Sequence, residues 1–131
     1  MVSATLSEAA VLVIDDESDA RQTLVRLLEM IGCSALSASS GPEALQLLKT
    51  GAKVDLILAD VVMPGMDGLE FAALARAMRP CLPVVMVTGD ANAADAVIAA
   101  GTLALIKPYS LETLGRVMAD ALVSDAGNTL S

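Results

Sequence analysis

Short, mostly apolar runs alternate along the chain with stretches whose apolar residues recur at helical spacing. The apolar runs have the length of buried strands and lie at residues 11–14, 34–38, 54–59, 84–87 and 103–106. Each is followed by a predicted helix, at residues 18–30, 41–50, 69–78, 91–100 and 110–122. The pattern therefore predicts five strand–helix units in succession.

This alternation determines the expected fold class. Near-continuous apolar strands are typical of parallel sheets whose two faces are both covered by helices. We therefore expect an α/β protein of three layers, with a five-stranded parallel sheet between two layers of helices. Ligands bind such sheets outside the carboxyl ends of the strands. The residues that follow each apolar run are therefore the candidate site.

Reactive polar side chains follow four of the five predicted strands. Asp15 and Asp16 come after the first strand, Asp60 after the third, Thr88 after the fourth and Lys107 after the fifth. Three carboxylates about 4 Å apart repel one another by roughly 4 kcal/mol per pair at an effective dielectric constant near 20. Such a cluster requires a cation or bound protons, and carboxylate oxygens suit Mg²⁺.

The same group of side chains indicates phosphoryl transfer. This chemistry depends on positioning the phosphoryl group and on neutralising the charge on its oxygens, for which a cation, an amine and a hydroxyl are suited. A carboxylate can itself be the nucleophile and form an aspartyl phosphate. We therefore interpret the strand ends as a candidate phosphoryl-transfer site.

Composition excludes several other functions. The chain has 131 residues, enough for one domain, and a net charge of −8, which disfavours direct nucleic-acid binding. It contains no His, so His-based catalysis and His-ligated metals are excluded. The longest nearly uninterrupted apolar stretch, at 96–106, has eleven residues, whereas about 20 are needed to span a membrane. Cys33 and Cys81 are predicted to be buried in a reducing compartment, and we expect a cytoplasmic protein without membrane insertion.

Four motifs carry a resemblance to a known family. They are VLVIDD at 11–16, DVVMPGMDG at 60–68, VTG at 87–89 and IKP at 106–108. In this order and spacing, the chain resembles the receiver domain of two-component response regulators. The resemblance covers residues 10–123, so we expect one receiver domain, with tails at 1–9 and 124–131 and no output domain.

The resemblance implies a role for each predicted site residue. Asp60 would be the phosphoacceptor, Lys107 would pair with the phosphoryl group, and Thr88 would donate a hydrogen bond to it. The expected Mg²⁺ ligands are the side chains of Asp15, Asp16 and Asp60 and the backbone carbonyl of Val62. The bond between Lys107 and Pro108 is expected to be cis.

The resemblance also implies a flavodoxin-like strand order of 2-1-3-4-5, a phosphorelay partner and a mode of action. The donor would be a sensor histidine kinase or a histidine phosphotransfer protein, because this chain has no His of its own. Phosphorylation would change the binding of a downstream protein partner. The chain would then be a signalling switch that assists its own phosphorylation and dephosphorylation, and not an enzyme.

One feature departs from the family, and two alternative functions stay open. Many receivers carry an aromatic residue on the fifth strand, but Ala104, Leu105 and Ile106 precede Lys107 here, while Tyr109 is predicted to pack beneath a loop. One alternative is a Mg²⁺-dependent phosphatase of the haloacid dehalogenase type, although such enzymes have an Asp-x-Asp motif that is missing after Asp60. The other is a degenerate receiver that acts only as an interaction module.

Overall fold

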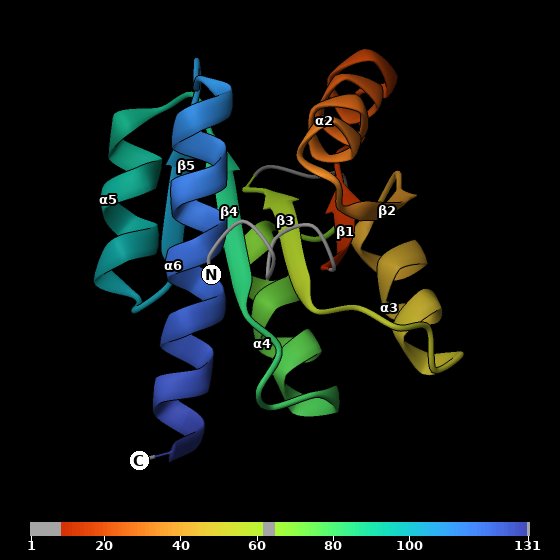
Figure 1. Cartoon of the computed structure of the whole chain (residues 1–131). Helices are drawn as coiled ribbons and strands as arrows, with labels where there is room; N and C mark the ends of the chain where they lie inside the picture. Colours follow the sequence, from red (N-terminus) through yellow and green to blue (C-terminus); the bar gives the residue numbers. More distant parts are fainter. Residues whose placement is uncertain (1–8, 62–64, 131) are drawn as a thin grey trace.

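The computed structural model describes residues 9–61 and 65–130, of which residues 123–130 are described by their backbone alone. The described strands are β1 (Ala10–Ile14), β2 (Ser34–Ala38), β3 (Leu56–Asp60), β4 (Val84–Thr88) and β5 (Leu103–Ile106). The described helices are α2 (Ser18–Ile31), α3 (Gly41–Lys49), α4 (Gly68–Met78), α5 (Ala91–Ala99) and α6 (Leu111–Leu130). Strands and helices alternate along the chain, as the hydrophobic pattern predicts (Figure 1).

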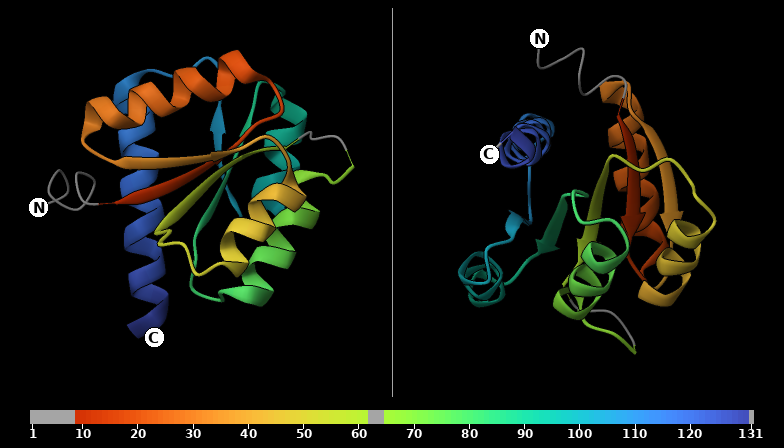
Figure 2. Two further views of the ribbon diagram at one scale, coloured as in Figure 1. Left: turned by 90° about the vertical axis from the view of Figure 1, so that its right-hand side faces the viewer. Right: turned by 90° about the horizontal axis from the view of Figure 1, so that it is seen from below.

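The strands form one parallel sheet of order β2-β1-β3-β4-β5, which confirms the predicted topology. Helices α2 and α6 cover one face, and α3, α4 and α5 cover the other (Figure 2). Strand β1 lies between β2 and β3, so the chain moves outward from β1 in one direction and from β3 in the other. The helices that follow these two strands, α2 and α4, cover opposite faces of the sheet. Such a point is where α/β sheets of this type bind ligands.

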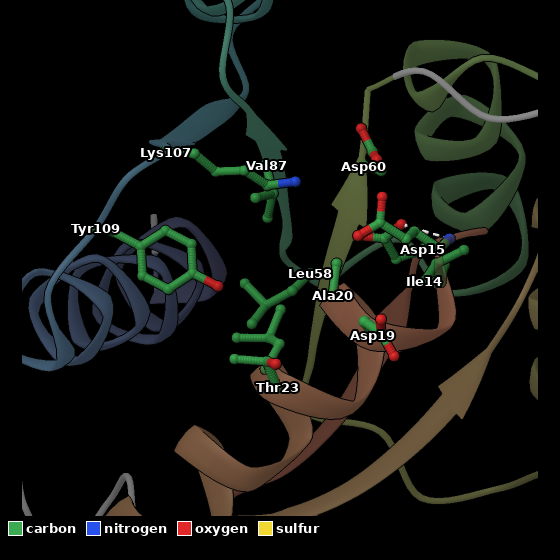
Figure 3. A pocket seen from close by; sticks show the side chains of 12 residues that line it. Ile14, Asp15, Asp19, Ala20, Thr23, Leu58, Asp60, Val87, Lys107 and Tyr109 are labelled. Atoms are coloured by element: carbon green, nitrogen blue, oxygen red, sulfur yellow. Dashed lines mark hydrogen bonds between the residues drawn. The ribbon is translucent and has the colours of Figure 1, made fainter.

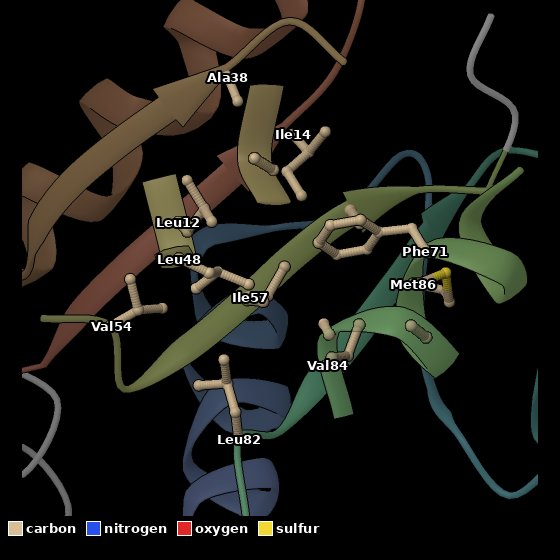
Figure 4. Packing of buried hydrophobic residues seen from close by; sticks show 14 of the residues in the cluster. Leu12, Ile14, Ala38, Leu48, Val54, Ile57, Phe71, Leu82, Val84 and Met86 are labelled. Carbon is tan, nitrogen blue, oxygen red and sulfur yellow. The ribbon is translucent and has the colours of Figure 1, made fainter. Parts of the chain in front are cut away.

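Two hydrophobic cores lie on the two faces of the sheet because side chains alternate along each strand. In β1, Leu12 and Ile14 face the core under α3, α4 and α5, whereas Val11 and Val13 face the core under α2 and α6. Phe71, the largest fully buried side chain, packs in the first of these cores (Figure 4). The central strands are buried on both faces, which explains their near-continuous apolar sequences.

Local side-chain bonds determine where helices begin. The Asp67 carboxylate accepts a hydrogen bond from the Glu70 N–H at 2.8 Å and begins α4, and the Ser110 hydroxyl accepts one from the Thr113 N–H at 3.0 Å and begins α6. At the other end of α2, Gly32 takes the left-handed conformation, with φ 100°, that ends the helix.

Several expectations needed correction. Helix α6 continues to Leu130 and not to 122, because Gly and Asn near its end each reduce helix stability by less than about 1 kcal/mol and no proline interrupts it. Strand β3 begins at Leu56, since the Asp55 carboxylate turns back to accept the Ala10 N–H at 2.8 Å. Cys33 is buried as predicted, but Cys81 is exposed, because it lies in the connection between α4 and β4.

Two further features bear on earlier expectations. The bond between Lys107 and Pro108 is cis, as the resemblance implies. Among the residues that the structure describes, no helix has the length and apolar character that crossing a bilayer requires.

Candidate functional site

Three carboxylates meet where β1 and β3 end. Asp15 follows β1 directly and is buried, Asp16 is exposed, and Asp60 is the last residue of β3. Because Ile14 pairs with Ala59 in the parallel register, Asp15 and Asp60 reach the same edge of the sheet. One carboxylate oxygen from each of the three residues lies within 4.8 Å of the others.

Backbone and side-chain bonds hold Asp15 in place. Its N–H donates to the Ala38 carbonyl at 3.2 Å, and its own carbonyl accepts from the Arg21 guanidinium at 2.8 Å. Its carboxylate accepts the Glu17 N–H at 2.9 Å, at the start of α2. Asp15 is therefore fixed by its neighbours on β2 and at the start of α2, with its carboxylate as one of the three in the acidic cluster.

Lys107 and Thr88 come from the neighbouring strands on the other side of β3. The Lys107 N–H donates to the Thr88 carbonyl at 2.8 Å, which fixes the segment after β5 against the end of β4. The amine of Lys107 points into a cavity, toward the side on which Asp15 and Asp60 lie (Figure 3). The Thr88 side chain is buried, and its hydroxyl oxygen accepts the Asp90 N–H at 3.1 Å.

The cavity has a volume of about 380 Å³ and lies between α2, the ends of the central strands and the segment after β5. Asp15, Asp60 and Lys107 line it, whereas Asp16 joins through the carboxylate cluster. Thr88 ends its strand at the same edge of the sheet. The structure thus brings together the predicted side chains, with Thr88 at the border of the site.

Several cavity-lining residues were not predicted as part of the site. Ala20 and Thr23 lie on one face of α2, and their three-residue spacing is the signal that indicates a shared face. Glu17 and Asp19 are exposed and also line the cavity.

Tyr109, two residues after Lys107, contacts both the hydrophobic core and the cavity. It packs against the core under α2 and α6, in keeping with the predicted packing role, but it also forms a wall of the cavity. Burial raises the pKa of its hydroxyl, and the negative charge of Asp15 raises it further. Tyr109 is therefore a neutral side chain at physiological pH.

The residues after Asp60 require a glycine at position 68. The Gly68 N–H donates to the Val61 carbonyl at 2.7 Å. A Cβ atom at Gly68 would lie 2.8 Å from the Asp60 carbonyl oxygen and 2.9 Å from the Val61 Cα. Because both neighbours are backbone atoms, any larger residue would displace the strand end that carries Asp60.

The donor set suits a hard divalent cation. All three carboxylates offer oxygen ligands, and their closeness would be unfavourable without positive charge. Mg²⁺ binds through one or two carboxylates, water and phosphate oxygens, and this cluster provides such ligands. The fourth predicted ligand, the backbone carbonyl of Val62, lies outside the described residues.

Comparison with known sequences agrees with this geometry. Residues 11–118 match the family model of the response regulator receiver domain. The chain is 38% identical over 118 residues to the sensor histidine kinase CheAY of Helicobacter pylori, covering 86% of this chain and 15% of that protein. It is 34% identical over 124 residues to the transcriptional regulatory protein GlrR of Escherichia coli, covering 92% of this chain and 28% of that protein. The chain thus spans less than a third of either relative.

Solved structures give the same result. A response regulator receiver domain protein from Clostridium thermocellum superimposes with a TM-score of 0.81 at 28% identity, over 91% of this chain and 98% of that one. The chemotaxis protein CheY4 of Vibrio cholerae superimposes with a TM-score of 0.76 at 32% identity, over 87% of this chain and 98% of that one. With its matching family model, strand order and acidic cluster, the chain belongs to the response regulator receiver domain family of two-component signalling.

Proposed function

We propose that this receiver domain is a switch that accepts a phosphoryl group on the carboxylate of Asp60. The donor is a phosphohistidine of a sensor histidine kinase or a histidine phosphotransfer protein, in the cytoplasm. The observation that carries the proposal is the convergence of three carboxylates within 4.8 Å of one another beside a cavity that Lys107 also lines.

In this proposal, Asp15, Asp16 and Asp60 hold Mg²⁺ through their carboxylates, together with the backbone carbonyl of Val62. When bound, the ion supplies positive charge that offsets the repulsion between the carboxylates and stabilises the phosphoryl oxygens. Asp15 needs little rearrangement for this role, because its backbone and carboxylate are already fixed by Ala38, Arg21 and Glu17.

The transfer itself uses side chains that the fold has positioned. A carboxylate oxygen of Asp60 attacks phosphorus as the P–N bond of the donor phosphohistidine breaks, and the donor's imidazole leaves with the electron pair of that bond. The Lys107 amine, which points into the same cavity, offsets negative charge on the phosphoryl oxygens. The Thr88 hydroxyl oxygen accepts the Asp90 N–H, so its own hydrogen can donate to a phosphoryl oxygen. Such a bond would draw Thr88 toward the site.

Phosphorylation then acts as a switch by favouring a second arrangement of the segments that follow β4 and β5. The bond between the Lys107 N–H and the Thr88 carbonyl, at 2.8 Å, couples these two segments. A change at Thr88 therefore reaches the segment that carries Lys107 and Tyr109. A protein partner that binds one arrangement better than the other reads the state of Asp60.

Incorporation of phosphate from a small phosphoramidate donor with Mg²⁺ tests the proposal. We expect one phosphate per chain, labile in base, in the wild type and in Asp55→Asn, and none in Asp60→Asn. Asp55 is the matched control, since it precedes the same strand at the opposite edge of the sheet. Intact mass spectrometry and Phos-tag electrophoresis measure the stoichiometry.

Other results would favour the two alternative functions. Sustained turnover of p-nitrophenyl phosphate that depends on Asp60 would identify a phosphatase. Failure of the wild type to take up phosphate, from a small donor or from a histidine kinase, would leave an interaction module and contradict the proposal.

A further inference from the structure

Helix α4 has an outer face that is almost entirely apolar. Its exposed residues lie on one half of the helix and include a single polar side chain; they are Leu69, Glu70, Ala73, Leu74, Ala77 and Met78. Leu69, Leu74 and Met78 are 36%, 42% and 37% exposed. A helix that covers a core normally presents polar residues to water, as most of the exposed residues of α2 are. The outer face of α4 therefore has the character of a contact surface for another protein.

Helices α3 and α4 also share an ordered distribution of charge. They pack side by side on one face of the sheet, and both run from the edge that carries the acidic cluster to the opposite edge (Figure 2). Each has an acidic residue in its first turn and a basic residue in its last turn, namely Glu43 and Lys49 in α3 and Glu70 and Arg76 in α4. The helix dipole favours such charges in any helix, but α2, α5 and α6 have no basic residue in the last turn. The face formed by α3 and α4 is therefore acidic at one end and basic at the other.

Such a face is complementary to a second copy of itself. A two-fold axis that crosses α3 and α4 at mid-length lays each helix antiparallel on the same helix of the second copy. The acidic end of each copy then meets the basic end of the other. Along α4, the positions of Leu69 and Met78 face each other across the axis, as do those of Ala73 and Leu74, so apolar residues meet apolar residues.

We propose that the outer face of α3 and α4 is the interface of a symmetric homodimer, in which α4 packs antiparallel on α4 of a second copy of this chain. An unrelated protein would need only an apolar surface to cover α4. The reversal of charge along both helices is the feature that a copy in antiparallel orientation matches. The inference goes beyond the proposed phosphorylation of Asp60 and does not depend on it.

Sedimentation velocity of the full chain over a range of concentrations tests this interface. We expect a monomer–dimer equilibrium in the wild type. Leu74→Lys brings two like charges together beside the axis, so the dissociation constant of the dimer should rise at least about tenfold. Met30→Lys is the matched control, because Met30 is 70% exposed and lies on α2, on the other face of the sheet. Its dissociation constant should stay within about twofold of the wild-type value.

Exchange of the two α3 charges tests the antiparallel arrangement. Glu43 and Lys49 are both exposed, whereas Arg76 is half-buried and donates to the Thr102 hydroxyl at 3.2 Å. Glu43→Lys and Lys49→Glu each create two pairs of like charges in the symmetric dimer, and each should raise the dissociation constant about tenfold.

The double variant Glu43→Lys/Lys49→Glu pairs opposite charges again. Its dissociation constant should return to within about threefold of the wild-type value. Both exchanged charges oppose the helix dipole, so the double variant should have the lowest melting temperature of the charge variants. Recovered dimerisation therefore could not arise from recovered stability.

The outcomes are distinguishable. A wild type that stays monomeric up to about 1 mM would overturn the proposal, and so would a dimer that Leu74→Lys leaves intact, because it would form through another surface. Single charge variants that lose the dimer without recovery in the double variant would overturn the antiparallel arrangement. The proposal requires loss in Leu74→Lys, retention in Met30→Lys and recovery in the double variant. Asp60→Asn should dimerise as the wild type does, so failure of the proposed function would leave this result unchanged.

Discussion

The sheet has one pocket at the carboxyl ends of its strands and another at the amino ends, here called hollows. Comparing them shows what distinguishes a reactive site from a structural one. The hollow at the carboxyl edge has a volume of about 380 Å³ and that at the amino edge about 440 Å³. The amino-edge hollow is lined by Asp55 and Arg79, and both make bonds to the backbone. Asp55 accepts the Ala10 N–H, and Arg79 donates to the Leu48 carbonyl at the end of α3.

At the carboxyl edge, by contrast, negative side chains outnumber the positive charge of Lys107. The carboxylates of Asp15, Asp16 and Asp60 lie close together, and a bound cation would offset their mutual repulsion while they stay ionised. At the amino edge, the charged side chains of Asp55 and Arg79 each form a hydrogen bond with one backbone group and so stabilise a loop or a helix end. Volume therefore does not identify the functional edge of this protein. The distribution of charge does.

The largest loss of phosphorylation and stability should follow from a substitution at Gly68, which packs against the strand end at the carboxyl edge. In Gly68→Ala, the new Cβ would meet the Asp60 carbonyl oxygen and the Val61 Cα, neither of which can move without displacing the strand end. We expect loss of Asp60 phosphorylation and a decrease in the free energy of unfolding of about 3 kcal/mol. Urea denaturation measures the stability, and intact mass measures the phosphate. A variant with wild-type phosphorylation would contradict this role of Gly68.

The next largest effect should be the stabilisation of the folded protein by Mg²⁺, which depends on carboxylates of the carboxyl edge alone. At a free Mg²⁺ concentration of 100 times its dissociation constant, the wild type should gain about 2.7 kcal/mol in unfolding free energy. Asp16→Asn should lose most of this gain, yet melt at a higher temperature than the wild type without metal, because one repelling carboxylate is gone.

Asp19→Asn is the control for this experiment. Asp19 lies at the same cavity but is not among the carboxylates of the described cluster. It should keep the Mg²⁺-dependent gain. Thermal melts with and without a chelator measure both effects, and an equal loss in both variants would mean that general surface charge, and not the cluster, binds the ion.

The amino edge should respond in stability alone. Asp55→Ala leaves the N–H of Ala10, a residue that is 8% exposed, without its side-chain acceptor. We expect the free energy of unfolding to fall by about 1–2 kcal/mol, whereas Asp55→Asn should restore most of it through its amide oxygen. Phosphorylation rates of both variants should match the wild type. Slower phosphorylation in the folded protein would show that the two edges are coupled.

The smallest effect is expected from modifying Cys81 in the amino-edge hollow. Cys81 is exposed and should react with iodoacetamide, whereas Cys33 is buried and its thiol pKa is raised by that burial. The thiolate is the reactive form, so Cys33 should stay unmodified near neutral pH until the protein unfolds. Peptide mapping locates the modification, and Asp60 phosphorylation should be unchanged after it.

The central part of the fold was predictable because its signals are local. The continuous apolar runs of β1, β3 and β4, and the capping residues Asp67 and Ser110, each determine structure within a few residues. The convergence of Asp15 and Asp60 was also predictable, because parallel strands present their carboxyl ends at one edge. These features need no knowledge of side-chain packing.

Other features depend on contacts between distant segments. Sequence alone indicates that Tyr109 packs under a loop, but only the folded chain shows that α2 lines the same cavity. The exposed position of Cys81 follows from the course of a connection, and the need for glycine at position 68 follows from the approach of α4 to the end of β3. Such tertiary contacts leave little trace in a single sequence.

Tyr109 is the only tyrosine in the chain, which also lacks tryptophan. The ultraviolet fluorescence of the whole protein therefore arises chiefly from one ring at the cavity wall, close enough to Asp15 to sense its charge. An ion or a phosphoryl group that reaches the acidic cluster changes the electric field at that ring. The unmodified protein thus contains its own optical probe of the site, and binding can be followed without an attached dye.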